Sequence, residues 1–225
     1  GRGPRCRSGW EHFPGNLGLT CGKATGHIDP EVVVRMARAS KREEIAQAAL
    51  EQFRTRGFNA TGISDITSAA GAPKGSFYNH FASKEESALE ALRRYAAGLR
   101  FDLLDTPGLP ALERLRAHFE FLGADTVAGG FARGCLVGNL GAEVADHSEE
   151  IRSAVRGGFQ RWAAQIRRVL TEAQEAGELD AALDVEEAAL FILSAWEGTL
   201  IAVRADKSSA PLDAFFRMVF GVLLR

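Results

Sequence analysis

The amino-acid sequence predicts an all-α protein in which three short helices near residues 42–81 precede a longer helical bundle. Apolar residues recur three and four positions apart along the chain after Arg42, which is the spacing of one face of an α-helix. Strict alternation of apolar and polar residues, which marks a half-buried strand, is almost absent. Glycine or proline stands at many joints between the periodic segments. Together these observations favour helices from end to end.

The first two short helices each end at a glycine. The first ends at Gly57, where a left-handed cap costs glycine little, and its apolar face consists of Ile45, Ala49, Leu50 and Phe53. Thr61 is the expected N-cap of the second helix, which ends at Gly71 and turns inward Ile63, Ile66 and Ala70. Because glycine permits a sharp reversal, Gly71 can join this helix to a third as a helix-turn-helix requires.

The next two helices have clear starting signals. Pro73 can start a helix over Lys74–His80. Ser83 is the expected N-cap of the fourth helix, with Glu86 at the third helical position as in a capping box. The fourth and later helices are expected at residues 84–104, 109–127, 134–145, 148–177, 184–205 and 212–224.

The composition is that of a globular protein without a metal or cofactor site. The 225 residues, 46% of them hydrophobic, can bury a substantial core in one domain or two small ones. The chain has no run of about 18 uncharged apolar residues, so no membrane span is expected. Its cysteines, Cys6, Cys21 and Cys135, are odd in number and lack metal-ligand spacing, so we expect neither disulfides nor zinc, and a reducing cytoplasm.

Charge is distributed unevenly along the chain. The net charge is −2, which by itself argues against a nucleic-acid partner. However, basic residues exceed acidic ones by three in residues 1–40 and by two in residues 41–100, and fall short by seven in residues 101–225. The N-terminal part is therefore the plausible phosphate-binding end, and the acidic remainder is not expected to contact DNA.

Residues 1–40 differ in composition from the rest of the chain. They are rich in Gly, Arg and Pro, lack helical periodicity and contain no apolar region of a secretory signal. We expect a disordered or appended arm, with a natural start at Met36 or a nearby valine codon. Mass spectrometry of the protein expressed from its own locus would test this expectation.

The third helix divides its residues between two roles. Phe77 and Phe81 are four positions apart and can pack inward, whereas polar side chains project elsewhere: Lys74, Ser76, Tyr78, Asn79 and His80. A basic group, a hydroxyl, a phenol, an amide and an imidazole can contact phosphates and base edges. From the spacing alone, a merely solvated polar face explains the pattern equally well.

The region around this helix resembles the DNA-binding region of the tetracycline-repressor (TetR/AcrR) family. The resemblance covers residues 42–90 and lies above all in the run Lys74-Gly-Ser-Phe-Tyr-Asn-His-Phe-Ala-Ser-Lys-Glu85. It implies a DNA-binding domain at residues 41–85 and an effector-binding and dimerisation domain at residues 86–225.

The resemblance also implies roles for individual residues. Thr61 and Ser64 match positions that contact the DNA backbone, and Lys74, Gly75 and Ser76 match the start of the recognition helix. Tyr78 and His80 match phosphate or groove contacts, although His80 could instead hydrogen-bond within the domain. Asn79 stands at a variable position and could set sequence preference, and Lys84 matches a phosphate-binding lysine at a helix N-terminus.

The helical remainder is expected to form a homodimer and to bind a small effector. The segment 188–203 is apolar around most of its circumference and must be buried on several sides, by a second copy or by the chain's own bundle. Aromatic residues could line a pocket among the middle helices or form ordinary core. The expected effector-binding residues are Phe119, Cys135, Asn139, Glu143, Phe159, Trp162 and Trp196; Leu122, Ile166, Phe191 and Arg133 are further candidates.

Cys135 raises an alternative mode of sensing. The segment 133–152 resembles a subgroup that includes the N-ethylmaleimide reductase repressor, in which a matching cysteine is associated with sensing electrophiles or oxidants. Cys135 lies near a helix N-terminus and Arg133, which can lower a thiol pKa. Asn139, however, replaces a lysine of that relative, and a buried, inert cysteine is the competing interpretation.

These observations predict a DNA-binding transcriptional regulator. We expect a repressor that a small molecule releases from double-stranded operator DNA; activation and redox sensing through Cys135 are the alternatives. The sequence lacks a phosphate-binding loop, a dinucleotide fingerprint, a paired-histidine zinc motif and a nucleophile elbow, so an enzyme is not expected. A nucleophilic pair of Cys135 and His147 is the remaining catalytic alternative.

Overall fold

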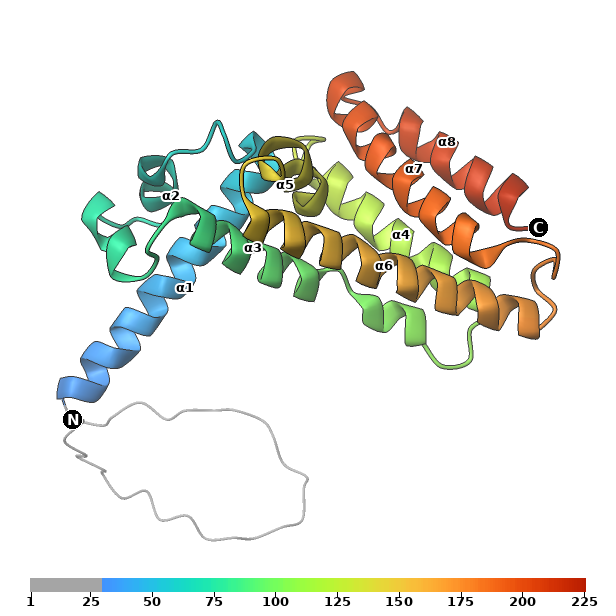
Figure 1. The fold of residues 1–225 in the computed structure, drawn as a ribbon, viewed down its shortest axis with the longest axis horizontal. Coiled ribbons are helices and arrows are strands. Elements are labelled where there is room, and N and C mark those ends of the chain that lie inside the picture. The colour runs from blue at the N-terminus through green and yellow to red at the C-terminus, as the bar shows by residue number, and fades with distance from the viewer. Residues whose placement is uncertain (1–29) are drawn as a thin grey trace, which may run out of the picture.

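The computed structural model describes the backbone of residues 30–225 and the side chains of residues 41–225 (Figure 1). This part of the chain is helical and contains no strand, which confirms the predicted all-α class. The α-helices are α1 (Pro30–Arg56), α2 (Ile63–Ala69), α3 (Lys84–Gly98), α4 (Ala111–Ala128), α5 (Leu136–Val144), α6 (Glu149–Glu175), α7 (Val185–Asp206) and α8 (Ala210–Met218). Three short turns of helix complete the fold: η1 (Lys74–Asn79), η2 (Phe101–Asp105) and η3 (Val219–Leu223).

Helix α1 begins eleven residues before the predicted start of the DNA-binding domain at residue 41. The expected arm ran to residue 40, but the backbone is helical from Pro30 onward. Proline fits the first helical turn because that position donates no intrahelical hydrogen bond, so Pro30 provides a start that the periodicity did not reveal. The rest of the expected arm, residues 1–29, lies outside the described residues.

The first three helices enclose a small apolar core at one end of the molecule (Figure 1). This core consists of fully buried side chains that include Ile45, Phe53, Ile66, Phe77 and Phe81. Two glycines with positive φ, Gly57 at 86° and Gly71 at 57°, make the reversals after α1 and α2. The predicted helix-turn-helix is therefore formed, and its second helix, η1, is a short 3-10 turn.

The expected N-cap of the second helix is wrong by one residue. Helix α2 is capped at Gly62, whose amide donates to Asp65 Oδ2 over 2.7 Å. The side chain of Thr61 instead turns inward and donates its hydroxyl to the carbonyl of Gly57 over 2.7 Å. The Thr61 hydroxyl thus supplies a donor to a carbonyl at the C-terminal end of α1. Thr61 therefore stabilises the end of α1 and does not cap the start of α2.

The start of α3 agrees with the sequence in its main contact. Ser83 Oγ accepts a hydrogen bond from the amide of Glu86 over 3.1 Å, as predicted for an N-cap. The Glu86 carboxylate accepts from the amide of Ala82, one residue before the cap, over 2.6 Å. Serine and glutamate thus satisfy two amide groups at the helix entrance.

The helix predicted over residues 84–104 is broken in the structure. Helix α3 ends at Gly98, and Arg100 adopts a left-handed conformation with φ 54° before the turn η2. The break allows both Leu99 and Leu104, five residues apart, to be buried against the bundle. At the C-terminus the helix predicted over 212–224 begins at Ala210 and continues as the wide turn η3 after Met218.

Helices α3, α4, α6, α7 and α8 build the bundle that extends away from the helix-turn-helix, with α7 and α8 side by side on one face (Figure 1). Among the described residues, α7 is the one helix long and apolar enough to cross a membrane, with a mean hydropathy of 1.4, contrary to the expectation that no segment qualifies. One face of α7 packs in the bundle through Ile192, Trp196 and Val203. Such a helix is also typical of a soluble core, and it is weak evidence for a membrane.

Candidate DNA-binding interface and effector site

The turn η1 presents its polar side chains on a firmly held base. Phe77 and Phe81 are buried, with ring centroids 5.5 Å apart. Tyr78 lies between them in sequence and is 60% exposed, and its ring meets that of Phe77 edge-on at 5.5 Å. The structure therefore separates the inward and outward residues as the sequence predicted, and Tyr78 extends from a rigid support.

The other expected DNA contacts surround Tyr78 with different degrees of exposure. Lys74, Asn79 and, on α2, Ser64 are exposed, and His80 is half-buried. A Cβ atom placed on Gly75 would meet no atom within 4 Å, so this stretch of backbone is open to a partner. The hydroxyl of Ser76 is buried and makes no hydrogen bond among the described residues.

Two expected contact residues serve the domain internally. Thr61 is buried, and its hydroxyl donates to the Gly57 carbonyl. Lys84 Nζ donates to the carbonyls of Phe58 and Thr61, both over 3.0 Å, and lies 4.0 Å from the centroid of the Phe58 ring. Lys84 thus fixes the loop between α1 and α2 with two of its three donors.

The bundle binds the carbonyl groups at the end of α1. Asn139 on α5 donates from Nδ2 to the carbonyls of Phe53 and Arg54, over 3.2 and 3.3 Å. Arg204 on α7 donates to the following carbonyl, that of Thr55, over 3.1 Å. We call these contacts of Asn139 and Arg204 the α1 clamp. The last carbonyls of a helix lack intrahelical partners, so the clamp supplies donors to them from α5 and α7.

Glu143 connects the same helix α5 to the loop after α1. Its Oε2 accepts from the amide of Asn59 over 2.7 Å. A Cβ atom at Gly57 would stand 2.3 Å from Glu143 Oε1, so Gly57 permits this close approach as well as its positive φ. Helix α5 is thus joined to the loop after α1 by a hydrogen bond and a close contact.

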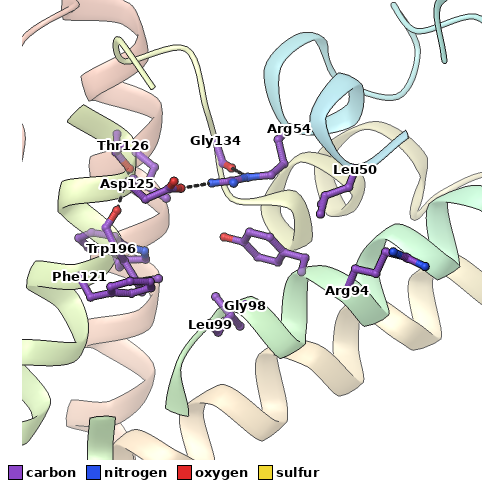
Figure 2. A pocket seen from close by; sticks show the side chains of 13 residues that line it. Leu50, Arg54, Arg94, Gly98, Leu99, Phe121, Asp125, Thr126, Gly134 and Trp196 are labelled. Carbon is purple, nitrogen blue, oxygen red and sulfur yellow. Dashed lines mark hydrogen bonds and ion pairs between the residues drawn. The ribbon is translucent and has the colours of Figure 1, made fainter. Parts of the chain in front are cut away.

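A small cavity of about 140 Å³ lies between the end of α1 and the bundle (Figure 2). Arg54 crosses it and pairs with Asp125, with 2.6 Å between Nη2 and Oδ2, and donates to the Gly134 carbonyl over 3.4 Å. The Arg54 guanidinium also lies 5.2 Å from the centroid of the Tyr95 ring. The ion pair of Arg54 and Asp125 thus forms part of the cavity wall, and the space that remains is small.

Three of the expected effector-binding aromatics lie in the core. Phe119, Trp162 and Trp196 are at most 1% exposed, and the rings of Phe119 and Trp196 are 5.1 Å apart. Trp162 Nε1 donates to Nε2 of His118 over 3.2 Å, and burial lowers the pKa of His118 to about 4. These residues pack as ordinary core, although Trp196 also lines the small cavity beside Arg54.

The remaining expected residues meet at a larger cavity of about 460 Å³ between α5, α6 and α7, here called the α5 cavity. Cys135, Asn139, Glu143 and Phe159 line it. Sequence reasoning missed two further lining residues, Glu197 and Arg204 on α7. The signal for Glu197 was a single carboxylate in the largely apolar segment 188–203. The predicted polar anchors thus line one cavity, whereas most of the aromatics do not. Arg133, a further candidate anchor, is paired with Glu51 and Asp125 instead.

Cys135 lies at a helix N-terminus, as predicted, where it occupies the N-cap position of α5, but it is 2% exposed. Burial raises the pKa of its thiol well above the usual value, and the nearby Glu197 carboxylate raises it further. Hydrogen bonds with Gly138 and Tyr95 oppose this effect. The thiol is therefore held in its protonated, less nucleophilic form.

Cys135 is expected to react slowly with thiol reagents. In a Cys6→Ser/Cys21→Ser variant at pH 8, labelling of the native chain with an aromatic disulfide reagent should be about a hundredfold slower than labelling in urea, because burial excludes reagent and raises the thiol pKa. The absorbance of the released thiolate measures both rates. Native labelling within about tenfold of the unfolded rate would restore the reactive-cysteine interpretation.

Sequence comparisons place both parts of the chain in one group of proteins. Residues 45–91 match the family described as bacterial regulatory proteins, tetR family. Residues 111–219 match the tetracyclin repressor-like C-terminal domain. The two matches correspond to the helix-turn-helix and to the bundle.

Individual relatives match over most of their length. The chain is 31% identical over 192 residues to the HTH-type transcriptional repressor DhaR of Mycobacterium sp. (strain GP1), covering 84% of this chain and 95% of the relative. It is 29% identical over 175 residues to the HTH-type transcriptional repressor NemR of Escherichia coli (strain K12), covering 76% and 88%. The crystal structure of the regulatory protein TetR from Rhodobacter sphaeroides superimposes with a TM-score of 0.75 at 32% identity, covering 79% of this chain and 95% of that one. With this fold, these domains and these relatives, the chain belongs to the TetR family of transcriptional regulators.

Proposed function

We propose that this chain is a repressor that binds operator DNA as a homodimer and is released by a small molecule bound in its bundle. TetR-family regulators bind operator DNA and act as dimers with small-molecule effectors. We assign residues 41–85 to DNA binding and residues 86–225 to effector binding and dimerisation. The observation that carries the proposal is the exposed Tyr78 on a turn whose flanking Phe77 and Phe81 are buried.

The contacts proposed for DNA follow from the exposure of each side chain. Lys74 is suited to a phosphate, and Tyr78 and Asn79 to groove contacts, because a cation binds phosphate without reading sequence whereas amide and phenol groups can bind base edges. Gly75 allows the backbone to approach closely. Thr61 and Lys84 support this surface from inside the domain.

Loss of operator contacts is expected to weaken DNA binding without unfolding the chain. Tyr78→Ala and Lys74→Ala should each reduce affinity for the upstream region of the chain's own gene about tenfold or more, because one base or phosphate contact contributes roughly 1–3 kcal/mol. Lys74→Ala should also reduce the dependence of affinity on salt. Gel-shift titration at several salt concentrations measures both effects.

Arg161→Ala is the matched control for charge, because Arg161 is an exposed arginine on α6 of the bundle. It should leave affinity unchanged. If the parent chain fails to bind its upstream region at moderate salt, or if the Arg161 variant binds as weakly as the Lys74 variant, the assigned DNA surface is incorrect.

The second copy is proposed to pack on α7. Its outer face exposes large apolar side chains, Leu190 at 54%, Phe191 at 60% and Ile201 at 72%. Met218 on α8 and Val222 on η3 are also exposed. A Cβ atom at Gly198, in the middle of this face, would meet nothing within 4 Å, so a partner helix can approach closely there. Two half-sites in DNA require two helix-turn-helix units, and a two-fold interface along α7 and α8 would bring two copies of the chain together.

Charge placed on this face is expected to separate the dimer. Ile201→Glu should shift the chain from dimer to monomer, because two like charges would be buried near the two-fold axis. Light scattering after size-exclusion chromatography gives the mass. Thr171→Glu, on the exposed surface of α6, adds the same charge away from this face and should remain dimeric. A parent chain that is monomeric at micromolar concentration would contradict the proposal.

A further inference from the structure

A buried carboxylate without a strong partner stands between two cavities of the bundle. Glu197 lines both the α5 cavity and a second cavity of about 720 Å³, here called the α6 cavity, which lies along α6. Gly141 and Phe159 also line both. Glu197 Oε1 is buried and accepts no hydrogen bond among the described residues.

The surroundings of Glu197 offer it little stabilisation. Its hydrogen-bonding neighbour is the thiol of Cys135, which is a weak donor. On its other side, a Cβ atom at Gly138 would stand 2.2 Å from Oε2, so glycine at this position makes room for the carboxylate. A buried acceptor without a donor is costly, which makes this group a place where a ligand donor would be strongly favoured.

The arginines that line the two cavities either have other partners or are exposed to water. Arg204 donates to the carbonyl of Thr55 in the α1 clamp. Arg152 is exposed and pairs with Glu149. Arg156 is also exposed, so water can solvate its charge at the rim of the α6 cavity. Glu143 already accepts from the amide of Asn59, so Glu197 is the cavity-lining acid without such a donor.

Most of the remaining lining is apolar, with Gln160 and Ser194 as polar residues of the α6 cavity and Asn139 of the α5 cavity. Val155, Ala163 and Leu193 face the α6 cavity, and Leu200 faces the α5 cavity. Ile201, on the exposed outer face of α7, stands at the rim of the α5 cavity. Such walls accommodate a hydrocarbon or aromatic body, while one polar group at the shared wall fixes its orientation. The two cavities thus share one carboxylate, Glu197, with mostly apolar walls on both sides of it.

We propose that these cavities bind a small apolar amine whose ammonium group donates to Glu197 while its hydrocarbon or aromatic body contacts Phe159 and the apolar walls. The inference rests on the proposed function, because it identifies small apolar amines as the class of molecule that acts as the effector. Burial raises the pKa of the free Glu197 carboxyl to about 7, and a bound ammonium would favour its ionised form. The same site disfavours carboxylate ligands, since two acceptors would face each other.

Ligand binding at this point can reach the DNA-binding domain by a short route. Gly138 and Cys135, which touch Glu197, belong to the same short helix and its cap as Asn139 of the α1 clamp. Movement of α5 away from Glu197 would pull the clamp and so tilt α1. A ligand acts as an inducer in this way only if it binds the tilted state more tightly.

Three probes with one body and different polar groups test the inference: 2-phenylethylamine, 2-phenylethanol and 3-phenylpropionate. Isothermal titration of the full dimeric chain at pH 8, without DNA, should show the amine binding at least tenfold more tightly than the alcohol, and the carboxylate most weakly. Glu197→Gln should remove the preference for the amine and leave binding of the alcohol. Glu187→Gln, an exposed carboxylate on the same helix, is the matched control and should bind as the parent does.

Thermal unfolding provides a second readout. Glu197→Gln should unfold at a higher temperature than the parent, because it removes an unpaired buried acid. Gly138→Ala keeps the acid but displaces it, and should weaken amine binding. The inference is overturned if the amine and the carboxylate bind equally well, or if millimolar amine does not bind. It is also overturned if the Glu197→Gln dimer is less stable than the parent, because a partner group would then already satisfy the acid. The same titration on operator-bound protein separates this inference from the proposed function. If the amine binds but the operator is not released, the inducer role alone is contradicted. If the chain binds its operator but not the amine, this inference alone is contradicted.

Discussion

Replacing Phe77 with alanine is expected to abolish operator binding and to lower the free energy of unfolding by about 3–5 kcal/mol. Phe77 is completely buried and contacts the rings of Tyr78 and Phe81. Its removal would leave a cavity beneath η1, and the turn is too short to hold its shape by its own hydrogen bonds. Chemical denaturation and gel-shift titration measure the two losses.

Phe77→Leu distinguishes support from direct contact. Leucine keeps much of the apolar contact and cannot reach DNA from a buried position, so it should restore most of the stability and of the DNA affinity. Tyr78→Ala, in contrast, should weaken DNA binding with little loss of stability. If Phe77→Leu were as stable as the parent yet failed to bind DNA, Phe77 would have a role beyond supporting the turn.

The α1 clamp gives the second large effect. Asn139→Asp is expected to destabilise the chain more than Asn139→Ala, although aspartate is closer in shape to asparagine. The amide of Asn139 donates to two carbonyls, and an ionised carboxylate would place negative charge against both oxygens. Asn139→Ala combined with Arg204→Ala should cost about 2–3 kcal/mol, since each lost hydrogen bond contributes roughly 0.5–1.5 kcal/mol.

Thermal unfolding between pH 4 and pH 8 checks the clamp. The Asn139→Asp variant should regain part of its stability at the acidic end, because a protonated carboxyl can donate to one carbonyl. Asn139→Ala should show no such recovery relative to the parent. Equal stabilities of the two variants at pH 8 would mean that Asn139 merely fills space between α5 and α1.

The clamp also explains why a residue first considered as an effector contact is placed elsewhere. Asn139 lines the α5 cavity, yet its Nδ2 group already donates to two carbonyls of α1. Glu143 is committed in the same way to Asn59. Two of the residues predicted to bind a ligand therefore hydrogen-bond to α1 and the loop after it. Glu197, whose Oε1 accepts no hydrogen bond among the described residues, was not among the predicted residues.

Local pattern determined most of the fold. The end of α1 at Gly57, the reversal at Gly71 and the cap at Ser83 were all predicted from the sequence, because each depends on a backbone conformation or a contact within a few residues. The inward positions of Phe77 and Phe81 follow from helical spacing. The start of α1 at Pro30 and the break near Arg100 were missed, since periodicity does not reveal where a segment begins or bends.

What the sequence by itself determined is the family, the helix-turn-helix and the exposed position of Tyr78. Only the tertiary structure decided that Thr61 and Lys84 turn inward, that Cys135 is buried beside Glu197, and that the polar residues of α5 hold the end of α1. The reason is that hydrogen-bond partners far apart in sequence, such as Asn139 and Phe53, are brought together by packing of whole helices. The spacing of residues along one helix does not specify which other helix will pack against it.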